Sequence, residues 1–131
     1  MKYKIFKSTI MNLLHNLASL EYQQDVWLNQ NNPENLIGSF VETVNMLFDD
    51  SIISYLLENN EVIISHEITQ TLRDLDRLLD LVNEFRPEIE IINDPQMILV
   101  RQKAAEALAL VLMSDGSEST VEIIDELPRA T

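Results

Sequence analysis

The stretch SHEITQTLRDLDRLLDLVNEFRP, residues 65–87, carries the clearest helical pattern in the chain. Its apolar residues recur at steps of three and four, which places them on one face of an α-helix. Ser65 is the predicted N-cap of this helix, and Arg86 is its predicted end, because a residue that precedes proline is pushed out of the α region. The apolar residues that define this helix are Ile68, Leu72, Leu75, Leu78, Leu79, Val82 and Phe85, and of these Leu75 and Leu79 are predicted to be core residues.

The same periodicity predicts further helices on both sides of this segment. Asn32 precedes Pro33, so it is the predicted N-cap of a helix with proline at its first position, where the missing N–H does no harm. Asp94 and Pro95 repeat that signal and predict the start of a last helix, which is apolar on nearly every side as far as Met113. That helix is expected to lie at the centre of the core. The other helices are predicted over residues 5–20, 22–28 and 51–57, and the helix that Asn32 opens is predicted to end near Phe48.

The composition agrees with a helical domain. The 131 residues are 46% hydrophobic, which suffices for one packed core, and only two glycines and four prolines are present for the turns that a β-protein needs. The alternating segment EIEII, residues 88–92, is predicted to be an extended connector, because no second strand is expected to pair with it. We therefore predict an all-α fold, a single-domain bundle of about five helices with a central apolar C-terminal helix. Residues 1–116 are predicted to form this domain, and residues 117–131 a mobile acidic tail.

Several classes of protein are disfavoured by what the sequence lacks. There is no cysteine, so a disulfide framework, a thiol nucleophile and a cysteine metal site are all excluded. The N-terminal MKYKIFKSTI has no continuous apolar region of the kind found in signal peptides. The longest mainly apolar run, residues 104–113, is far shorter than the roughly 20 residues of a membrane span. A soluble, cytoplasmic protein is expected.

The chain is strongly acidic, with a formal net charge of −13. Three of its nine basic residues are Lys2, Lys4 and Lys7, so the rest of the chain holds six basic residues against all 22 acidic ones. Such a charge repels nucleic acid and anionic lipid and attracts cationic surfaces. The predicted partner is therefore a basic protein, with no direct binding to nucleic acid or to membranes.

Residue types used in catalysis and metal binding occur without the spacing that such sites need. His15 and His66 are the only histidines, and neither lies in a zinc-motif spacing. Asp74, Asp76 and Asp80 lack the spacing and the central glycine of a calcium loop. No Gly-rich phosphate loop, serine-nucleophile elbow or Cys–His pair is present. The sequence predicts no enzyme, no metal site and no cofactor.

Three aromatic residues could either line a ligand pocket or pack in the core. Trp27, Phe40 and Phe48 fall at positions typical of a helical core. Aromatic residues at such positions pack in the core in most proteins. They are predicted to be core residues.

A stripe of acidic residues is the one feature that suggests a binding surface. Asp76, Asp80 and Glu84 follow one another at i, i+4 in the predicted helix, and like charges at this spacing cost a few tenths of a kcal/mol per pair. Arg73 and Arg77 fall within i, i+3 reach of Asp76 and Asp80, so a solvated face of surface ion pairs and a binding face are both open. The acidic excess continues into the next segment, which favours a binding face. The predicted partner-binding residues are Asp76, Asp80, Glu84, Glu88 and Glu90.

Several stretches resemble a family of small helical bacterial proteins. They are EYQQ at residues 21–24, Trp27, MLFDD at residues 46–50, the Leu-rich helix, and Asp94-Pro95 opening an Ala-rich helix. Members of that family look like immunity proteins of bacterial toxin systems, including contact-dependent growth inhibition. The resemblance covers roughly residues 20–112 and implies a helical inhibitor of a toxin. The matching residues pack or cap helices, so the resemblance assigns no binding residue.

The resemblance and the charge together predict an immunity protein that binds and neutralises a basic toxin, specifically a nuclease. Toxins that cut nucleic acid are basic because they contact phosphates, and an acidic inhibitor is steered onto such a surface. Two alternatives from other classes remain open. One is an acidic nucleic-acid mimic or regulator that occupies a DNA-binding protein, and the other is a non-catalytic scaffold subunit that self-associates through an apolar helix face.

Overall fold

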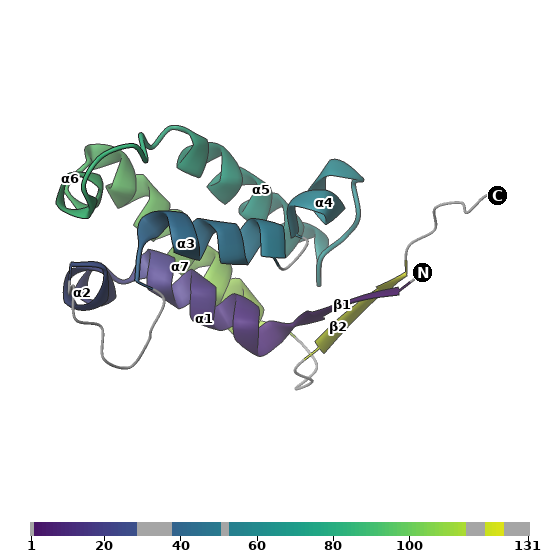
Figure 1. The fold of residues 1–131 in the computed structure, drawn as a ribbon. Coiled ribbons are helices and arrows are strands. Elements are labelled where there is room, and N and C mark those ends of the chain that lie inside the picture. The colour runs from purple at the N-terminus through teal and green to yellow at the C-terminus, as the bar shows by residue number, and fades with distance from the viewer. Residues whose placement is uncertain (1, 29–37, 51–52, 115–119, 125–131) are drawn as a thin grey trace.

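The structure is a computed structural model that describes residues 2–28, 38–50, 53–114 and 120–124 of the chain. Most of the described residues are helical, which confirms the all-α class predicted for the body of the molecule (Figure 1). Two of the helical stretches continue as π-helical turns, labelled η1 and η2. In chain order the elements are β1 (Lys2–Phe6), α1 (Lys7–Ala18), α2 (Leu20–Tyr22), η1 (Gln23–Trp27), α3 (Phe40–Val44), η2 (Asn45–Asp50), α4 (Ile53–Glu58), α5 (His66–Asp80), α6 (Glu88–Ile92), α7 (Pro95–Met113) and β2 (Thr120–Ile124).

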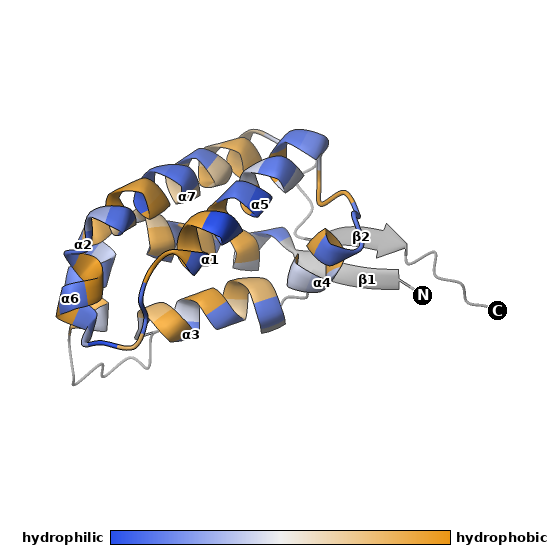
Figure 2. Cartoon of the chain, turned by 90° about the horizontal axis from the view of Figure 1, so that it is seen from above, coloured by the Kyte–Doolittle hydropathy of each residue, from blue (hydrophilic) through white to orange (hydrophobic). Residues whose placement is uncertain are grey.

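The last helix, α7, is buried along one face, which carries Met97, Val100, Ala104, Ala107 and Val111, so it is not enclosed on nearly every side as its apolar sequence predicts. It packs against both α1 and α5. Ala104 and Ala107 on α7 are fully buried, and their small side chains let the neighbouring helices approach closely. Ile98, Leu99, Leu112 and Met113 are about half exposed or more, so the helix presents apolar side chains to the surface along its length. In the view from above, α5 presents mainly hydrophilic residues, as expected of an outer helix whose apolar face points inward (Figure 2).

Helix α5 begins where the sequence predicts and ends earlier. The Ser65 Oγ atom accepts a hydrogen bond from the Ile68 N–H at 3.1 Å, which confirms Ser65 as the N-cap. The helix ends at Asp80 rather than at Arg86. The amides of residues 81 and 82 donate to the carbonyls three residues earlier, which tightens and closes the last turn. The prediction of a helix through Arg86 is therefore wrong, and Phe85, which belongs to the apolar pattern of the predicted helix, is 88% exposed.

The side chain of Asn83 explains why the chain leaves the helix while its hydrophobic pattern continues. Its Oδ1 atom accepts a hydrogen bond from the Phe85 N–H at 3.0 Å. Asparagine side chains compete with the helix for backbone groups in this way and favour turns. Val82 stays buried beside the helix end, whereas the residues after it turn outward.

Helix α3 begins at a cap that the sequence analysis did not propose. The Ser39 Oγ atom accepts a hydrogen bond from the Glu42 N–H at 3.0 Å, and the Glu42 carboxylate accepts one from the Gly38 N–H at 2.9 Å. Serine followed three residues later by glutamate is the pattern of a capping box. The predicted cap at Asn32 with Pro33 lies outside the described residues.

Residues 88–92 form the short helix α6, so the extended connector predicted for EIEII is incorrect. Pro87 precedes the helix with an extended backbone and leaves the first turn free to form. Ile91 and Ile92 are both buried although they are adjacent in sequence. Alternation along a strand would expose one of the two, whereas a helix end that packs against the bundle can bury both.

The two ends of the described chain pair with each other. β1 and β2 form a two-stranded antiparallel sheet in which Lys2 pairs with Ile124 and Phe6 with Thr120 (Figure 1). The sequence pattern predicts a first helix that includes Ile5 and a mobile tail over residues 117–131. The first helix instead begins at Lys7, and Thr120–Ile124 is a strand. The pairing joins segments more than a hundred residues apart, so neither segment shows its partner locally.

Candidate functional site: an acidic groove beside α5

A groove opens between α3 and the C-terminal half of α5, and it continues along the turn that follows α5. Its volume is about 300 Å³. Phe40, Leu79 and Val82 are buried and form its apolar floor together with the partly buried Val44. Acidic and amide side chains and one aromatic ring complete the lining, namely Asp76, Asp80, Asn83, Glu84 and Phe85.

Three of the predicted partner-binding residues meet in this groove. Asp76 and Asp80 stand four residues apart on α5, whose inner face is anchored in the core by Leu75 and Leu79. Glu84 lies beyond the helix end, so the predicted helical stripe of three acids is wrong in detail. The turn after α5 nevertheless brings Glu84 into the lining of the same groove.

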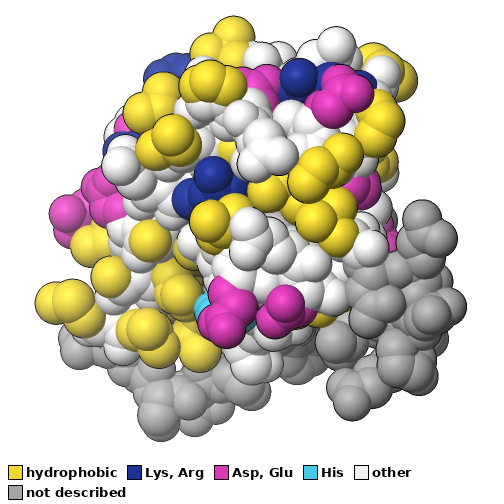
Figure 3. Space-filling view, turned by 90° about the vertical axis from the view of Figure 1, so that its left-hand side faces the viewer, with side chains coloured by type: hydrophobic (Ala, Val, Ile, Leu, Met, Phe, Trp, Pro, Cys, Tyr) yellow, Lys and Arg dark blue, Asp and Glu magenta, His cyan; other side chains and the backbone are white. Residues whose placement is uncertain are grey.

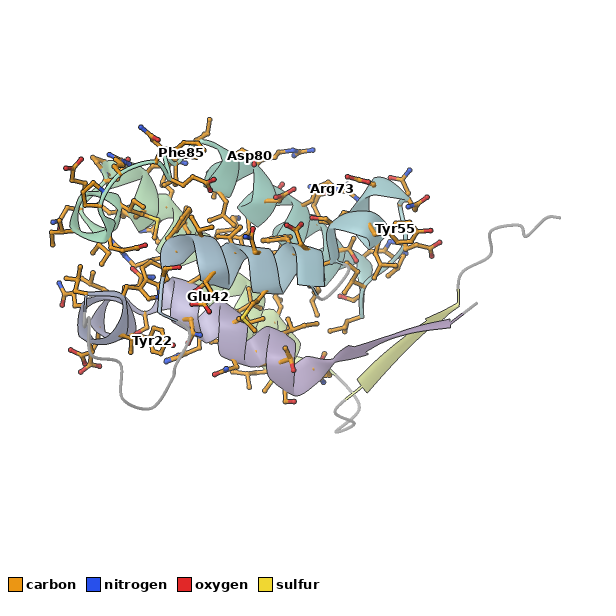
Figure 4. All side chains as sticks on the ribbon, viewed as in Figure 1. Tyr22, Glu42, Tyr55, Arg73, Asp80 and Phe85 are labelled. Atoms are coloured by element: carbon orange, nitrogen blue, oxygen red, sulfur yellow. The ribbon has the colours of Figure 1, made fainter. Side chains whose placement is uncertain are left out.

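The two arginines of α5 do not pair with the acids of the groove. The Arg77 Nη1 atom lies 3.4 Å from the Asp74 Oδ1 atom, and Arg73 Nη1 donates to the Leu57 carbonyl at 3.2 Å. Figure 4 shows Arg73 near α4, whereas Asp80 lies further along α5. The ion pairs among the described residues include those of Arg77 with Asp74, Arg86 with Asp94 and Lys103 with Glu106. None of these ion pairs involves a groove carboxylate, although Arg73 and Arg77 still attract Asp76 over a longer distance.

The charge on Asp76 is disfavoured by its surroundings. Partial burial raises the pKa of the Asp76 carboxyl above its ordinary value, and the negative charges of Asp80 and Asp49 raise it further. The positive charges of Arg73 and Arg77 lower this pKa but do not cancel the rise. A cation placed in the groove would relieve the repulsion.

The other two predicted site residues lie outside the groove lining. The Glu88 Oε2 atom accepts a hydrogen bond from the Phe40 N–H at 3.3 Å, which ties the start of α6 to the start of α3. Burial raises the pKa of the Glu88 carboxyl, and the hydrogen bond from Phe40 opposes that rise. Glu90 is exposed on α6. Glu88 is therefore engaged within the fold, and Glu90 is not brought together with Asp76 and Asp80.

Phe85 is the residue of this site that the sequence analysis misplaced most. Its ring is exposed at the same end of α5 as Asp80 (Figure 4). The turn that carries it is fixed, because Asn83 bonds the Phe85 amide and Arg86 Nε donates to the Asn83 carbonyl at 2.7 Å. Arg86 also pairs with the Asp94 carboxylate at the start of α7. An exposed aromatic ring is thereby held on a well-anchored turn.

The remaining candidates for chemistry have structural explanations. The His15 ring packs edge-on against Tyr22, with ring centroids 6.3 Å apart. The Trp27 and Phe40 rings pack edge-to-face in the core at 6.1 Å, which confirms the packing interpretation of these aromatic residues. The described residues contain no group of three or more His, Asp or Glu side chains placed to hold a metal ion.

The end of the molecule formed by α2 and α6 shows a different surface. Hydrophobic side chains reach the surface there among scattered charged ones (Figure 3). They include Leu20 and Ile89, which are roughly half exposed. Arg101 donates from Nη1 to the buried Gln23 Oε1 at 2.9 Å, so it links α7 to η1 inside the fold. Single exposed apolar residues are normal on soluble domains and do not mark a site.

None of the described helices combines the length and the apolar character needed to cross a membrane. No protein-family model, curated protein or solved structure matches this chain. The groove and its charges are therefore the basis on which a function is assigned.

Proposed function

We propose that this protein is a non-catalytic inhibitor that binds a basic protein through the acidic groove. In its specific form, the proposal is an immunity protein that neutralises a basic bacterial toxin, a nuclease. The proposal rests on one observation, which is that the groove acids Asp76, Asp80 and Glu84 line an apolar floor and take part in none of the ion pairs found among the described residues.

The combination of apolar floor and unpaired acids suits a protein interface better than a solvated face. A solvated face gains its stability from internal pairs between opposite charges, but Arg77 pairs with Asp74, outside the groove, and Arg73 donates to the Leu57 carbonyl. Affinity at protein interfaces comes from a few buried anchors, and surrounding charges set the association rate and the choice of partner. The apolar floor can receive a buried anchor of the partner, and the acids can set the association rate and the choice of partner.

The toxin part of the proposal is supported by charge and by the family resemblance of the sequence. A nuclease presents basic residues to phosphates, and the groove presents carboxylates in their place. The net charge of −13 adds long-range attraction to any such partner. An inhibitor of this kind would act in the cytoplasm, where a toxin of this class meets its target.

The experiment uses the native operon and two matched variants of the protein. The groove variant carries Asp76→Asn, Asp80→Asn and Glu84→Gln. The control variant carries Glu21→Gln, Asp25→Asn and Glu58→Gln, which change the net charge equally at exposed residues outside the groove. Each tagged protein is co-expressed with its neighbouring genes, and the retained proteins are identified by mass spectrometry. Light scattering then measures the mass of the complex.

We expect the wild type and the control variant to retain one basic protein in a defined complex, and the groove variant to lose it. Expression of that basic protein alone should be toxic, and the wild type should restore growth. Retention of the same partner by the groove variant, or a partner that is not basic, would overturn the proposal.

A further inference from the structure

The size of the groove limits what it can receive. A volume of about 300 Å³ is at the lower end of the range for small-molecule pockets, which is about 300–1,000 Å³. A helix bound in a groove places anchors at i, i+3, i+4 and i+7 and needs a longer trough. The groove beside α5 has room for one long side chain of a partner protein.

The residues that line the groove determine which type of side chain it can bind. Val44 and Leu79 offer apolar contact for an aliphatic stem, while Asp76, Asp80 and Glu84 offer acceptors for a cationic head. Lysine and arginine both combine an apolar stem with a charged tip. The occupant is therefore a basic side chain that enters lengthwise.

The exposed ring of Phe85 favours arginine over lysine. A guanidinium is planar, is less strongly hydrated than an ammonium, and stacks on aromatic faces. Its fork of N–H groups also matches the two oxygens of a carboxylate. Because Asn83 and Arg86 already fix the turn that carries Phe85, little conformational freedom is lost when the ring is covered.

We propose that the groove is a socket for one arginine side chain of the partner, with its stem on Val44 and Leu79, its guanidinium received by the groove acids, and its plane against Phe85. This inference rests on the proposed function and specifies what that function recognises. The repulsion among Asp76, Asp80 and Asp49 agrees with it, because a buried cation would offset that repulsion.

The probes are three capped five-residue peptides in which the central residue of an alanine background is arginine, lysine or citrulline. Citrulline has the shape of arginine without its charge. Each peptide is titrated at low salt, up to about 10 mM, into the full-length protein labelled with nitrogen-15, since a single anchor binds with a Kd on the order of millimolar. The variants are Phe85→Ala and, as a control, Leu81→Ala, because Leu81 is 69% exposed on the same turn and does not line the groove.

The arginine peptide should give saturable shifts at the amides of residues 82–85 and of Val44, and the citrulline peptide should give none. The lysine peptide should bind about two- to fivefold more weakly, which is the size of an exposed cation–π contribution. Phe85→Ala should weaken arginine binding by a similar factor and remove the preference over lysine, whereas Leu81→Ala should leave both unchanged.

Two results would overturn the inference. They are the absence of saturable shifts at the groove with the arginine peptide, and equal binding of arginine and lysine with no effect of Phe85→Ala. The capture experiment tests the proposed function independently of both results. If the basic partner is still lost with the groove variant, the proposed function stands and the arginine socket falls. If the peptides bind as expected while capture of the partner is independent of the groove acids, the proposed function falls.

Discussion

Asp76 occupies a position in which the surrounding fold opposes its negative charge, because partial burial and the charges of Asp80 and Asp49 all raise the pKa of its carboxyl. In the unfolded chain these influences are absent. Folding therefore weakens the acid, so the charged carboxylate lowers the free energy of unfolding at neutral pH. The penalty is fully present above the folded-state pKa of Asp76 and disappears as the pH falls through it. Charged groups that destabilise the fold in this way are often found at functional sites.

Asp76→Asn should raise the free energy of unfolding at neutral pH by a few tenths of a kcal/mol, because one member of the like-charge cluster is removed. The gain should shrink as the pH is lowered, since the wild-type carboxyl then becomes protonated as well. Urea unfolding at pH 7 and at about pH 3 measures both effects. Asp25→Asn, at an exposed position on η1, is the control. A loss of stability at neutral pH would show that Asp76 is stabilising in the free protein.

At the scale of elements, the beginning of α5 depends on one buried hydroxyl. The Thr69 Oγ1 atom accepts a hydrogen bond from the Ile63 N–H at 2.7 Å and lies 2.6 Å from the Ser65 carbonyl, to which it donates. These bonds hold the loop before the helix, in which Ile64 has a positive φ of 66°. Such a backbone is unfavourable for a β-branched residue and persists only where the surroundings enforce it.

Thr69→Val keeps the shape of the side chain but leaves the buried amide of Ile63 without its acceptor. We expect a loss of about 1–3 kcal/mol in the free energy of unfolding, measured by chemical denaturation. Thr69→Ser keeps the hydroxyl and should retain most of the stability. Equal losses in the two variants would mean that the methyl group, rather than the hydrogen bonds, stabilises the loop.

The inner face of α5 should behave as an ordinary core surface. Leu75 is fully buried on the helix, which packs on α7, and Leu75→Ala should lower the free energy of unfolding by about 2–5 kcal/mol. Leu81→Ala, just past the helix end and 69% exposed, should change it by less than about 0.5 kcal/mol. Thermal and urea unfolding of both variants would check this contrast, and a near-neutral Leu75→Ala would mean that the buried face has been misassigned.

These elements show which parts of the structure the sequence can predict. The cap at Ser65 and the buried Leu75 and Leu79 follow from signals within a few residues of each other. The end of α5 does not, because the hydrophobic period continues past Asp80 while the side chain of Asn83 takes over the backbone of the turn. The exposure of Phe85 follows from that early end and so could not be predicted either.

At the scale of the whole molecule, the parts that escaped prediction depend on contacts between distant segments. The groove exists because Phe40 and Val44 on α3 face Asp76 and Asp80 on α5. The pairing of β1 with β2 likewise joins the two ends of the chain. Local patterns determine which segments are helical, but they do not determine which helices enclose a groove.

The long-range attraction between the whole protein and a basic partner can be tested by measuring association rates. With the basic partner identified by capture, Asp80→Lys with Glu84→Lys should slow association at low salt and flatten the dependence of the association rate on ionic strength, because the groove then repels the approaching cationic surface.

Glu21→Lys with Asp25→Lys is the control, because it changes the net charge equally at exposed residues outside the groove. If only the net charge of −13 steers the partner, both double variants should slow association alike. If the groove is the docking face, the groove variant should show the larger decrease, and stopped-flow measurements over a range of salt concentrations would separate the two. Association rates equal to wild type in the groove variant at every salt concentration would place the binding surface elsewhere. Glu90 would be the next residue to change, because it is exposed whereas Glu88 is bonded to the Phe40 amide.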